Sequence, residues 1–427
     1  MKNVNKERVM IKDCFAKHYF NNNKQQAYQF LEAAVNEYKS TESSTLIFLL
    51  GAVAALFFIV LFLLIEPGKP EAFDINKLEE ALPIFRFILC IAFAFMWSGI
   101  VIENLKEYRV NYVIIFESNP ANRVAPSGMY ILSAIVILLW LFWLIGEIMT
   151  MKNYVEPDPH FFAYLLIVLF LIMFLLPFPY FQSVIRFPII TGTVNALFSP
   201  FSEVRFLEFF IGDVLTSFVK PFIDVAMIAW FANKNANPEE ELVCHPKMFW
   251  AIFAWYLPFH IRFWQCINKW YNTGDAFPHL ANAGKYFSSI VMIITNYHYG
   301  RNPELREIVI FVSLFASTYS YIWDILMDWR LYRDGGWLRE TILYPPKYYY
   351  FSAITNLFLR FLWLAPFFIA EWYPQIFEDI EVLTAILCLA EIYRRAQWSL
   401  FRLEIENIYN FEKYRTILEI PRLPRDA

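Results

Sequence analysis

The chain has 427 residues and is 58% hydrophobic with a mean hydropathy of +0.39, which is typical of a membrane protein and not of a soluble globular domain. Its net charge of only −4 argues against a nucleic-acid partner. The five cysteines show no CxxC pair and no other metal-ligand spacing, so the sequence predicts no metal site, no cofactor and no disulfide framework.

Apolar stretches of about 20 residues, the length that crosses a bilayer, recur along the whole chain. They predict an all-α fold, a polytopic membrane helix bundle of about ten transmembrane helices. The predicted spans, in chain order, are 46–65, 84–102, 129–149, 161–181, 206–231, 249–263, 281–297, 309–325, 349–370 and 382–401.

These spans divide the chain into four parts. Because the N-terminal segment is polar, a cleavable signal peptide is not expected, and the first span would target the chain to the membrane. The parts are a short cytosolic N-terminal segment (1–43), the first four spans with a connector (44–204), six further spans with a polar core (205–404) and a cytosolic C-terminal tail (405–427).

Lysines and arginines are distributed unevenly among the predicted loops. With ten spans, both termini and the even-numbered loops lie on one side, and that side holds most of the basic residues. The positive-inside rule therefore places both termini in the cytosol. The basic loop residues on that side are Lys106, Arg109, Arg123, Arg330, Arg333, Arg339 and Lys347.

Ionisable side chains inside a membrane are costly unless they are paired or hydrated, so they usually mark a pathway. In the first half of the chain only Glu147 stands out, near the end of the third span. In the second half, helical spacings of three and four gather polar residues on common faces of the spans. These faces hold Asp213, Thr216 or Ser217, Lys220 and Asp224; Asp324 and Asp328; Arg360 and Trp363; and Glu391, Arg394, Arg395, Trp398 and Arg402.

Facing one another, these helices would form a polar core in which arginines and a lysine are partly balanced by carboxylates. Guanidinium groups bind phosphate or carboxylate through two parallel hydrogen bonds, and Lys285 at the start of the seventh span adds a point charge. The acids would position the arginines and limit affinity, because a conducting site must release its ion. Such a core suits a tetrahedral oxyanion, with Trp363 and Trp398 lining or plugging the path.

Simpler interpretations of the same residues remain open. Glu391 and its neighbouring arginines could form a structural ion-pair network between helices. Asp324 and Asp328 could lie at the membrane interface, beside tryptophans. Lys285 alone could be a snorkelling anchor. The crowding of all these groups into the second half of the chain favours the polar core.

An enzyme is the weaker interpretation, because the sequence has no glycine-rich phosphate loop, no HExxH and no GxSxG motif. An intramembrane transferase that used Asp324 and Asp328 with a metal would rest on a DxxxD pattern alone. No catalytic residue is therefore assigned.

A series of short motifs follows in a fixed order over roughly 205–415. They are RF (262–263) with QC (265–266), AFPHL (276–280), NAGKY (282–286), IWD (322–324) with MDW (327–329), LRE (338–340), YP (344–345), LRF (359–361) with Trp363, RR (394–395) with Trp398, FRLE (401–404) and EN (406–407). Together they resemble the signature of the EXS family, and the apolar first half fits the remaining spans of that family.

The EXS family contains phosphate exporters related to the xenotropic and polytropic retrovirus receptor, and shorter Golgi proteins of the ER-retention-defect type. The resemblance implies movement of inorganic phosphate through a pore in the second-half bundle, within a lipid bilayer. It implies gate or supporting roles for Trp363, Glu391, Asp324, Trp398 and Arg402. It implies phosphate contacts from Asp213, Thr216, Lys285, Tyr286, Asp328, Arg360, Arg394 and Arg395.

Two features depart from the family pattern. The segment 1–43 is too short for the SPX sensor of the long members, so regulation through inositol polyphosphates is not expected and the short Golgi members are the closer likeness. In addition, NKWYN at 268–272 replaces a basic run, and Thr216 stands where the family has asparagine.

The first hypothesis is therefore a Golgi transporter that returns phosphate, released by glycosyl transfer, from the lumen to the cytosol. The second is a sorting or retention factor that holds glycosyltransferases in the Golgi through its cytosolic ends. The third is a plasma-membrane phosphate exporter. Small residues in the first span, Gly51-Ala52 and Ala54-Ala55, weakly indicate a homodimer.

Overall fold

The computed structural model describes residues 10, 13–19, 23–65, 75–118, 123–152, 154–155, 161–176, 181–226, 246–299, 302–332, 336–365 and 380–410. Within these residues the chain forms helices and turns and contains no strand, which confirms the all-α prediction. The chain divides into two compact units, Met1–Ala55 and Leu56–Ala427, and the packing described below belongs to the second.

The described helices range from four residues to 42 residues in length. A π-helical turn, Asp324–Asp328 (η4), directly follows α12, and 3₁₀ turns lie at Pro303–Leu305 (η3) and Leu362–Leu364 (η5). Two short helical stretches, 13–19 and 219–226, carry no label. The labelled α-helices are α2 (Lys24–Ile65), α3 (Ile75–Glu107), α4 (Tyr112–Ile115), α5 (Pro126–Met151), α6 (Phe161–Leu175), α7 (Ser183–Leu197), α8 (Phe206–Leu215), α10 (Pro246–Thr273), α11 (Ala276–Tyr299), α12 (Arg306–Trp323), α13 (Pro346–Arg360) and α15 (Ile380–Tyr409).

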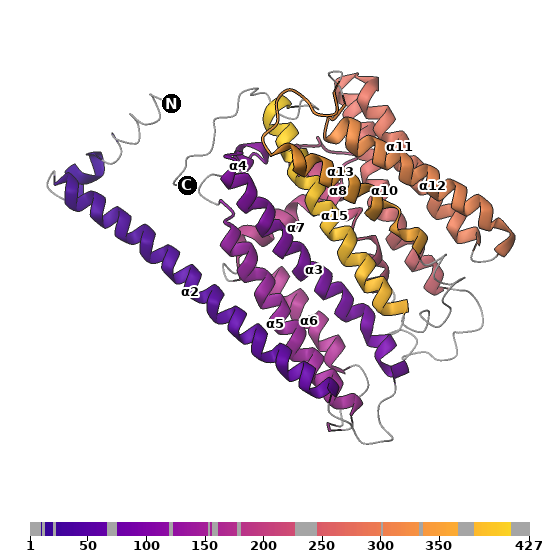
Figure 1. The fold of residues 1–427 in the computed structure, drawn as a ribbon, viewed down its shortest axis with the longest axis horizontal. Helices are drawn as coiled ribbons and strands as arrows, with labels where there is room; N and C mark the ends of the chain where they lie inside the picture. Colours follow the sequence, from indigo (N-terminus) through magenta and orange to yellow (C-terminus); the bar gives the residue numbers. More distant parts are fainter. Residues whose placement is uncertain are drawn as a thin grey trace. The chain divides into compact units, whose positions relative to one another are not determined.

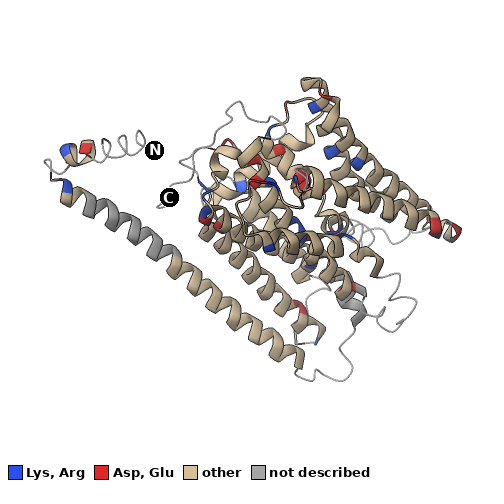
Figure 2. Cartoon of the chain, turned by 45° about the horizontal axis from the view of Figure 1, so that its top comes forward, with Lys and Arg blue, Asp and Glu red and all other residues tan. Residues whose placement is uncertain are grey.

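Among the described residues, four helical segments are long and apolar enough to cross a membrane, and α6 and α7 are shorter apolar helices. Figure 2 shows that the described apolar stretch of α2 contains no charged residue. The chain is therefore a membrane protein, and the four segments coincide with the first, second, third and eighth predicted spans. They are Ser43–Ile65, Ala81–Glu107, Pro126–Met151 and Arg306–Asp328.

Helices α3, α5 and α6, here called the first-half bundle, lie side by side and are joined mainly by apolar packing (Figure 1). Ile88 lies fully buried in their shared core. Two of the polar side chains there end on backbone carbonyls: Ser133 donates to the carbonyl of Ala92, and the indole of Trp140 donates to that of Phe85, both at 2.8 Å. Such bonds satisfy polar groups in the membrane without needing a charged partner.

Helices α8, α10, α11, α12, α13 and α15, with η4, form the second-half bundle. Helix α11 packs against both α10 and α12, while α15 packs against α13 and against α3 of the first-half bundle (Figure 1). Figure 2 shows acidic and basic residues among these helices. The second-half bundle therefore holds most of the charges predicted to lie in the membrane.

The predicted fifth span, 206–231, is not one continuous helix. Helix α8 ends at Leu215, residues 216–218 are not helical, and a helix resumes over 219–226. Pro221 explains the break, because it has no N–H to donate to the carbonyl of Ser217 and its ring would clash with that carbonyl in a helix. The Thr216 hydroxyl instead donates to the carbonyl of Asp213 at 2.7 Å.

Several predictions concern residues outside the described part of the chain. The C-terminal tail is described only to residue 410, and the N-terminal segment only in part. The ends of the fourth, fifth and ninth predicted spans, at 177–180, 227–231 and 366–370, also lie outside it.

Candidate functional site

A small polar cavity of about 40 Å³ lies at the centre of the second-half bundle. Because one water molecule needs about 10–15 Å³ of such space, the cavity has room for a few waters or one small ion. Residues from α8, α10, α11, α12, η4, α13 and α15 meet around it. They are Asp213, Thr216, Phe259, Lys285, Tyr286, Ser289, Ser320, Asp324, Asp328, Arg360 and Arg395.

Asp213 is held on one side of the cavity by two donors. Its Oδ1 accepts a bond of 2.5 Å from the Tyr286 hydroxyl and one of 3.2 Å from Nε of Arg262. Arg262 is buried between the rings of Phe209 and Tyr286. Gly212 makes room for it, because a Cβ at that position would lie 2.7 Å from Cδ of Arg262. The charge of Asp213 is thus compensated by Arg262, which does not itself line the cavity.

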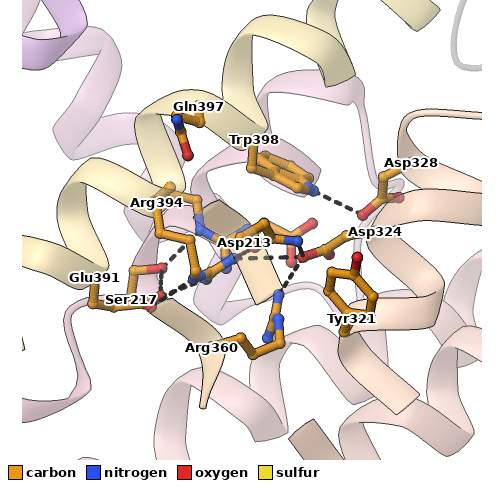
Figure 3. A network of polar contacts seen from close by, with 12 residues as sticks. Asp213, Ser217, Tyr321, Asp324, Asp328, Arg360, Glu391, Arg394, Gln397 and Trp398 are labelled. Atoms are coloured by element: carbon orange, nitrogen blue, oxygen red, sulfur yellow. Dashed lines mark hydrogen bonds and ion pairs between the residues drawn. The ribbon is translucent and has the colours of Figure 1, made fainter. Parts of the chain in front are cut away.

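Asp324 is a second carboxylate in the cavity lining, and it binds two arginines (Figure 3). Its Oδ2 pairs with Arg360 and, at 3.5 Å, with Arg394, and it accepts a bond of 3.1 Å from the Asn356 amide. Arg394 also forms a bidentate pair with Glu391 at 2.5 and 2.6 Å. The group joins η4, α13 and α15, and most of its charge is compensated internally.

Asp328 makes fewer polar contacts than Asp213 or Asp324 in the described part of the chain. Its Oδ2 accepts a bond of 2.8 Å from the indole of Trp398 (Figure 3). No ion pair of Asp328 occurs within the described part of the chain. One oxygen of this carboxylate therefore remains available to a ligand in the cavity.

Two cations line the cavity without an ion pair among the described residues. Lys285 is only 6% exposed, and its ammonium lies over the rings of Tyr286 and Trp323, at 4.3 and 5.3 Å from their centroids. Within the described ranges Arg395 donates to two hydroxyls, those of Ser217 at 2.7 Å and Thr216 at 2.9 Å. A buried cation without an anionic partner is costly, so these two groups favour an anion in the cavity.

The sequence profile of the EXS family matches residues 81–408, which is more than half of the chain. The chain belongs to the EXS family. The match begins at α3, well before the motifs that first indicated the family, so the first-half bundle is part of the EXS region.

Curated EXS relatives match over 79% of this chain and 52% of their own length. The xenotropic and polytropic retrovirus receptor 1 homolog of Xenopus laevis is 29% identical over 362 residues. Solute carrier family 53 member 1 is 30% identical over 370 residues in Mus musculus and 29% over 369 residues in Homo sapiens. The chain thus spans about half the length of the curated relatives it matches.

Most of the site residues that the EXS resemblance implies line the small polar cavity. Of the eight predicted phosphate contacts, seven line the cavity, and Asp324, predicted to have a supporting role, lines it as well. Arg394 does not line the cavity but lies behind it, between Asp324 and Glu391. Whether any of these residues touches phosphate stays a prediction.

Four residues predicted as gate or supporting groups lie outside the cavity lining. Glu391 and Trp398 support Arg394 and Asp328 from α15. Trp363 donates to the hydroxyl of Ser317 on α12 at 3.0 Å. Arg402 is fully buried and pairs with Glu406 at 3.2 Å, farther along α15.

The structure also bears on two interpretations that the sequence left open. Asp324 and Asp328 are buried within the bundle and line the cavity. Lys285 is buried at the cavity and is not a surface anchor. Both outcomes agree with a polar core.

Sequence reasoning missed Phe259, Ser289 and Ser320. The two serines could have been found, because Ser289 follows Lys285 by four residues and Ser320 precedes Asp324 by four, the spacing of one helical face. Phe259 carries no such signal. It enters the site because α10 packs against α11.

Proposed function

We propose that this chain transports inorganic phosphate across a membrane through the cavity of the second-half bundle. The observation that carries the proposal is the pair of cations, Lys285 and Arg395, that line the buried cavity without an ion pair among the described residues. The solute carrier name of the relatives supports transport as the class of activity. Phosphate as the substrate rests on the family resemblance and on the chemistry of the lining.

The lining offers donors suited to a tetrahedral oxyanion. The ammonium of Lys285 supplies a point charge, while the guanidinium groups of Arg395 and Arg360 supply planar forks of N–H groups. Hydroxyls of Ser289 and Ser320 add neutral donors from two further helices. A phosphate ion would thus be surrounded by donors from α11, α12, α13 and α15.

The acids in the lining do not prevent anion binding. Asp213 and Asp324 are each bonded to arginine, so they act mainly to orient their partners. Asp328 has a different use: inorganic phosphate carries hydrogen at neutral pH, and a carboxylate accepts a hydrogen bond from it. Sulfate has no such hydrogen, so Asp328 would favour phosphate over sulfate.

Interrupted helices beside the cavity support a transport pathway. The break at 216–218 and the π-helical turn η4 both adjoin lining residues, Thr216 and Asp324. Discontinuous helices and π-bulges recur at substrate sites of transporters and other proteins, where irregular backbone lines a cavity. Trp363 and Trp398 as gate residues remain predictions.

The finer topology is also a proposal. Helices α10, α11, α13 and α15, together with α6 and the broken fifth span, would complete about ten spans, with both termini in the cytosol. The Golgi membrane as the location, and lumen-to-cytosol as the direction, are expectations from the resemblance. Imaging of a tagged chain with organelle markers would separate the Golgi from the plasma membrane.

The decisive experiment measures release of radiolabelled phosphate from proteoliposomes that contain the full chain. Lys285→Met and Arg395→Gln should each lower the rate about 10- to 100-fold, the loss expected when a charged hydrogen bond to the ion disappears. Arg306→Gln serves as the matched control, because Arg306 is exposed and lies outside the cavity. Its rate should equal that of the wild type.

Two results would overturn the proposal. One is wild-type phosphate release by both cavity variants. The other is the absence of phosphate release from wild-type protein that elutes as a single folded species.

A further inference from the structure

Ser217 lies in the break of the fifth predicted span and contacts two charged residues of α15 at once. Its hydroxyl donates to Oε1 of Glu391 at 2.6 Å (Figure 3) and accepts from Nε of Arg395 at 2.7 Å. Ser217 is only 4% exposed and does not line the polar cavity. A single hydroxyl therefore lies between a carboxylate and one of the two cations that line the cavity.

The backbone break explains how Ser217 reaches this position. Helix α8 ends at Leu215, and the N–H of Ser217 donates to the carbonyl of Val214 at 2.9 Å, a bond that spans three residues instead of four. The resulting turn presents two successive hydroxyls, those of Thr216 and Ser217, to the guanidinium of Arg395.

The spacing of Glu391 and Arg395 favours a different partner for this arginine. The two residues are four apart on α15 with the acid nearer the N-terminus, the arrangement in which an acid and a base on a helix pair best. Among the described residues, however, no ion pair joins them, and Glu391 pairs with Arg394 instead. The Ser217 hydroxyl thus takes the place of Glu391 beside the Arg395 Nε.

The two neighbouring arginines differ in what this leaves for the cavity. Arg394 is compensated by Glu391 and does not line the cavity, whereas Arg395 lines it. Thr216 and Ser217 use two of the five N–H donors of Arg395, so others remain for an anion. Because a hydroxyl is neutral, these bonds hold the guanidinium in place without compensating its charge.

Position 217 requires a small side chain that donates and accepts through one atom. The one hydroxyl hydrogen of Ser217 goes to Glu391, and its lone pairs remain to accept from Arg395. Alanine would do neither, and cysteine would do both only weakly. A carboxylate there would repel Glu391 and compensate the charge of Arg395.

We propose that Ser217 is a positioning residue for phosphate binding, which holds Arg395 toward the cavity and prevents Arg395 from pairing with Glu391. This inference rests on the phosphate site proposed above, because it assigns Ser217 a role in keeping one of the two cations of that site available. Ser217 acts through Arg395 and not by contact with the ion.

The test measures the phosphate concentration that half-saturates binding to purified full-length protein, from the rise in melting temperature with added phosphate. Ser217→Ala should raise this concentration about tenfold, because Arg395 then turns toward Glu391 and loses a charged hydrogen bond to the ion. Ser217→Cys nearly keeps the size of serine but is a weaker donor and acceptor, so it should raise the concentration about threefold.

Ser133→Ala is the matched control. Ser133 is also 4% exposed and also loses a hydrogen bond, but it lies in the first-half bundle and outside the polar cavity. Its half-saturating concentration should equal that of the wild type.

A double variant separates positioning from a general structural role. In an Arg395→Gln background, Ser217→Ala should change the half-saturating concentration by less than about twofold, because the group that Ser217 positions is gone. A serine that only stabilised the fold would produce the same shift with and without Arg395.

Either of two results would contradict this inference alone. One is an unchanged half-saturating concentration in Ser217→Ala or, should that variant not fold, in Ser217→Cys. The other is an equal shift in the presence and absence of Arg395. If phosphate has no effect on folded wild-type protein, the proposed phosphate site fails, and this inference fails with it.

Discussion

The first-half and second-half bundles satisfy buried polar groups in different ways. In the first-half bundle, Ser133 and Trp140 bond to backbone carbonyls, which any helix provides. In the second-half bundle, Asp324 on η4 pairs with Arg360 on α13 and Arg394 on α15, so the bonds depend on the register of three elements. Where the first-half bundle does bury an arginine, at Arg86 of α3, its partner Asp224 comes from outside that bundle.

The charged network of the second-half bundle joins helices at a higher cost than apolar packing does. Taking charges out of water is costly, and an apolar core of the same volume is often as stable. The network surrounds a cavity with two cations that have no ion pair among the described residues, whereas Ile88 and its neighbours form a closely packed apolar core. The second-half bundle thus bears a cost of buried charge that the phosphate site proposed above would explain.

The largest expected effect is that of Asp324→Ala. This change leaves the Arg360 guanidinium without its ion pair in a buried site, and removing one partner of a buried pair costs about 3–5 kcal/mol. The free energy of unfolding should fall by that amount in denaturant titrations of purified protein, and phosphate transport should be lost. The double variant Asp324→Ala, Arg360→Ala should recover part of the stability. A single variant as stable as the wild type would contradict the view that this pair is coupled.

A somewhat smaller effect is expected for Ile88→Ala in the first-half bundle. The cavity left by the missing side chain should lower the free energy of unfolding by about 2–5 kcal/mol. The phosphate transport rate per folded molecule should not change, because Ile88 does not line the polar cavity. Ile308→Ala, at an exposed position of α12, serves as the control and should cost less than about 1 kcal/mol. A lower transport rate in folded Ile88→Ala would contradict the view that the first-half bundle contributes to stability and not to transport.

The smallest effect is expected for Asp328→Asn. Loss of the charged acceptor should reduce the discrimination of phosphate from sulfate about tenfold, while stability changes by less than about 1 kcal/mol because the amide oxygen can still accept from Trp398. Competition of unlabelled sulfate with radiolabelled phosphate in proteoliposomes measures this discrimination. Asp275→Asn, near the α10–α11 turn and outside the cavity lining, is the control. Unchanged selectivity in Asp328→Asn would remove this carboxylate from the recognition of phosphate.

Part of the candidate site could be predicted because residues three or four apart in the sequence lie on the same face of a helix. Asp324 and Asp328 are four residues apart and line one cavity, as their spacing suggests. The same reasoning placed Glu391, Arg395 and Arg402 on one face of α15. It could not say which of the three line the cavity. Glu391 and Arg402 lie about 16 Å apart along a helix axis, which exceeds the reach of a small cavity. Arg402 therefore belongs to a separate buried pair with Glu406.

The sequence by itself determined the membrane class, the helical fold and the set of polar residues in the second half, because apolar length and helical periodicity are local properties. Tertiary structure decided which charges are compensated. Arg394 and Arg395 are neighbours in the chain, yet α15 turns Arg394 toward Glu391 and Asp324 and leaves Arg395 with the hydroxyls of Thr216 and Ser217. That difference depends on which helix packs against each face of α15, and no local pattern specifies it.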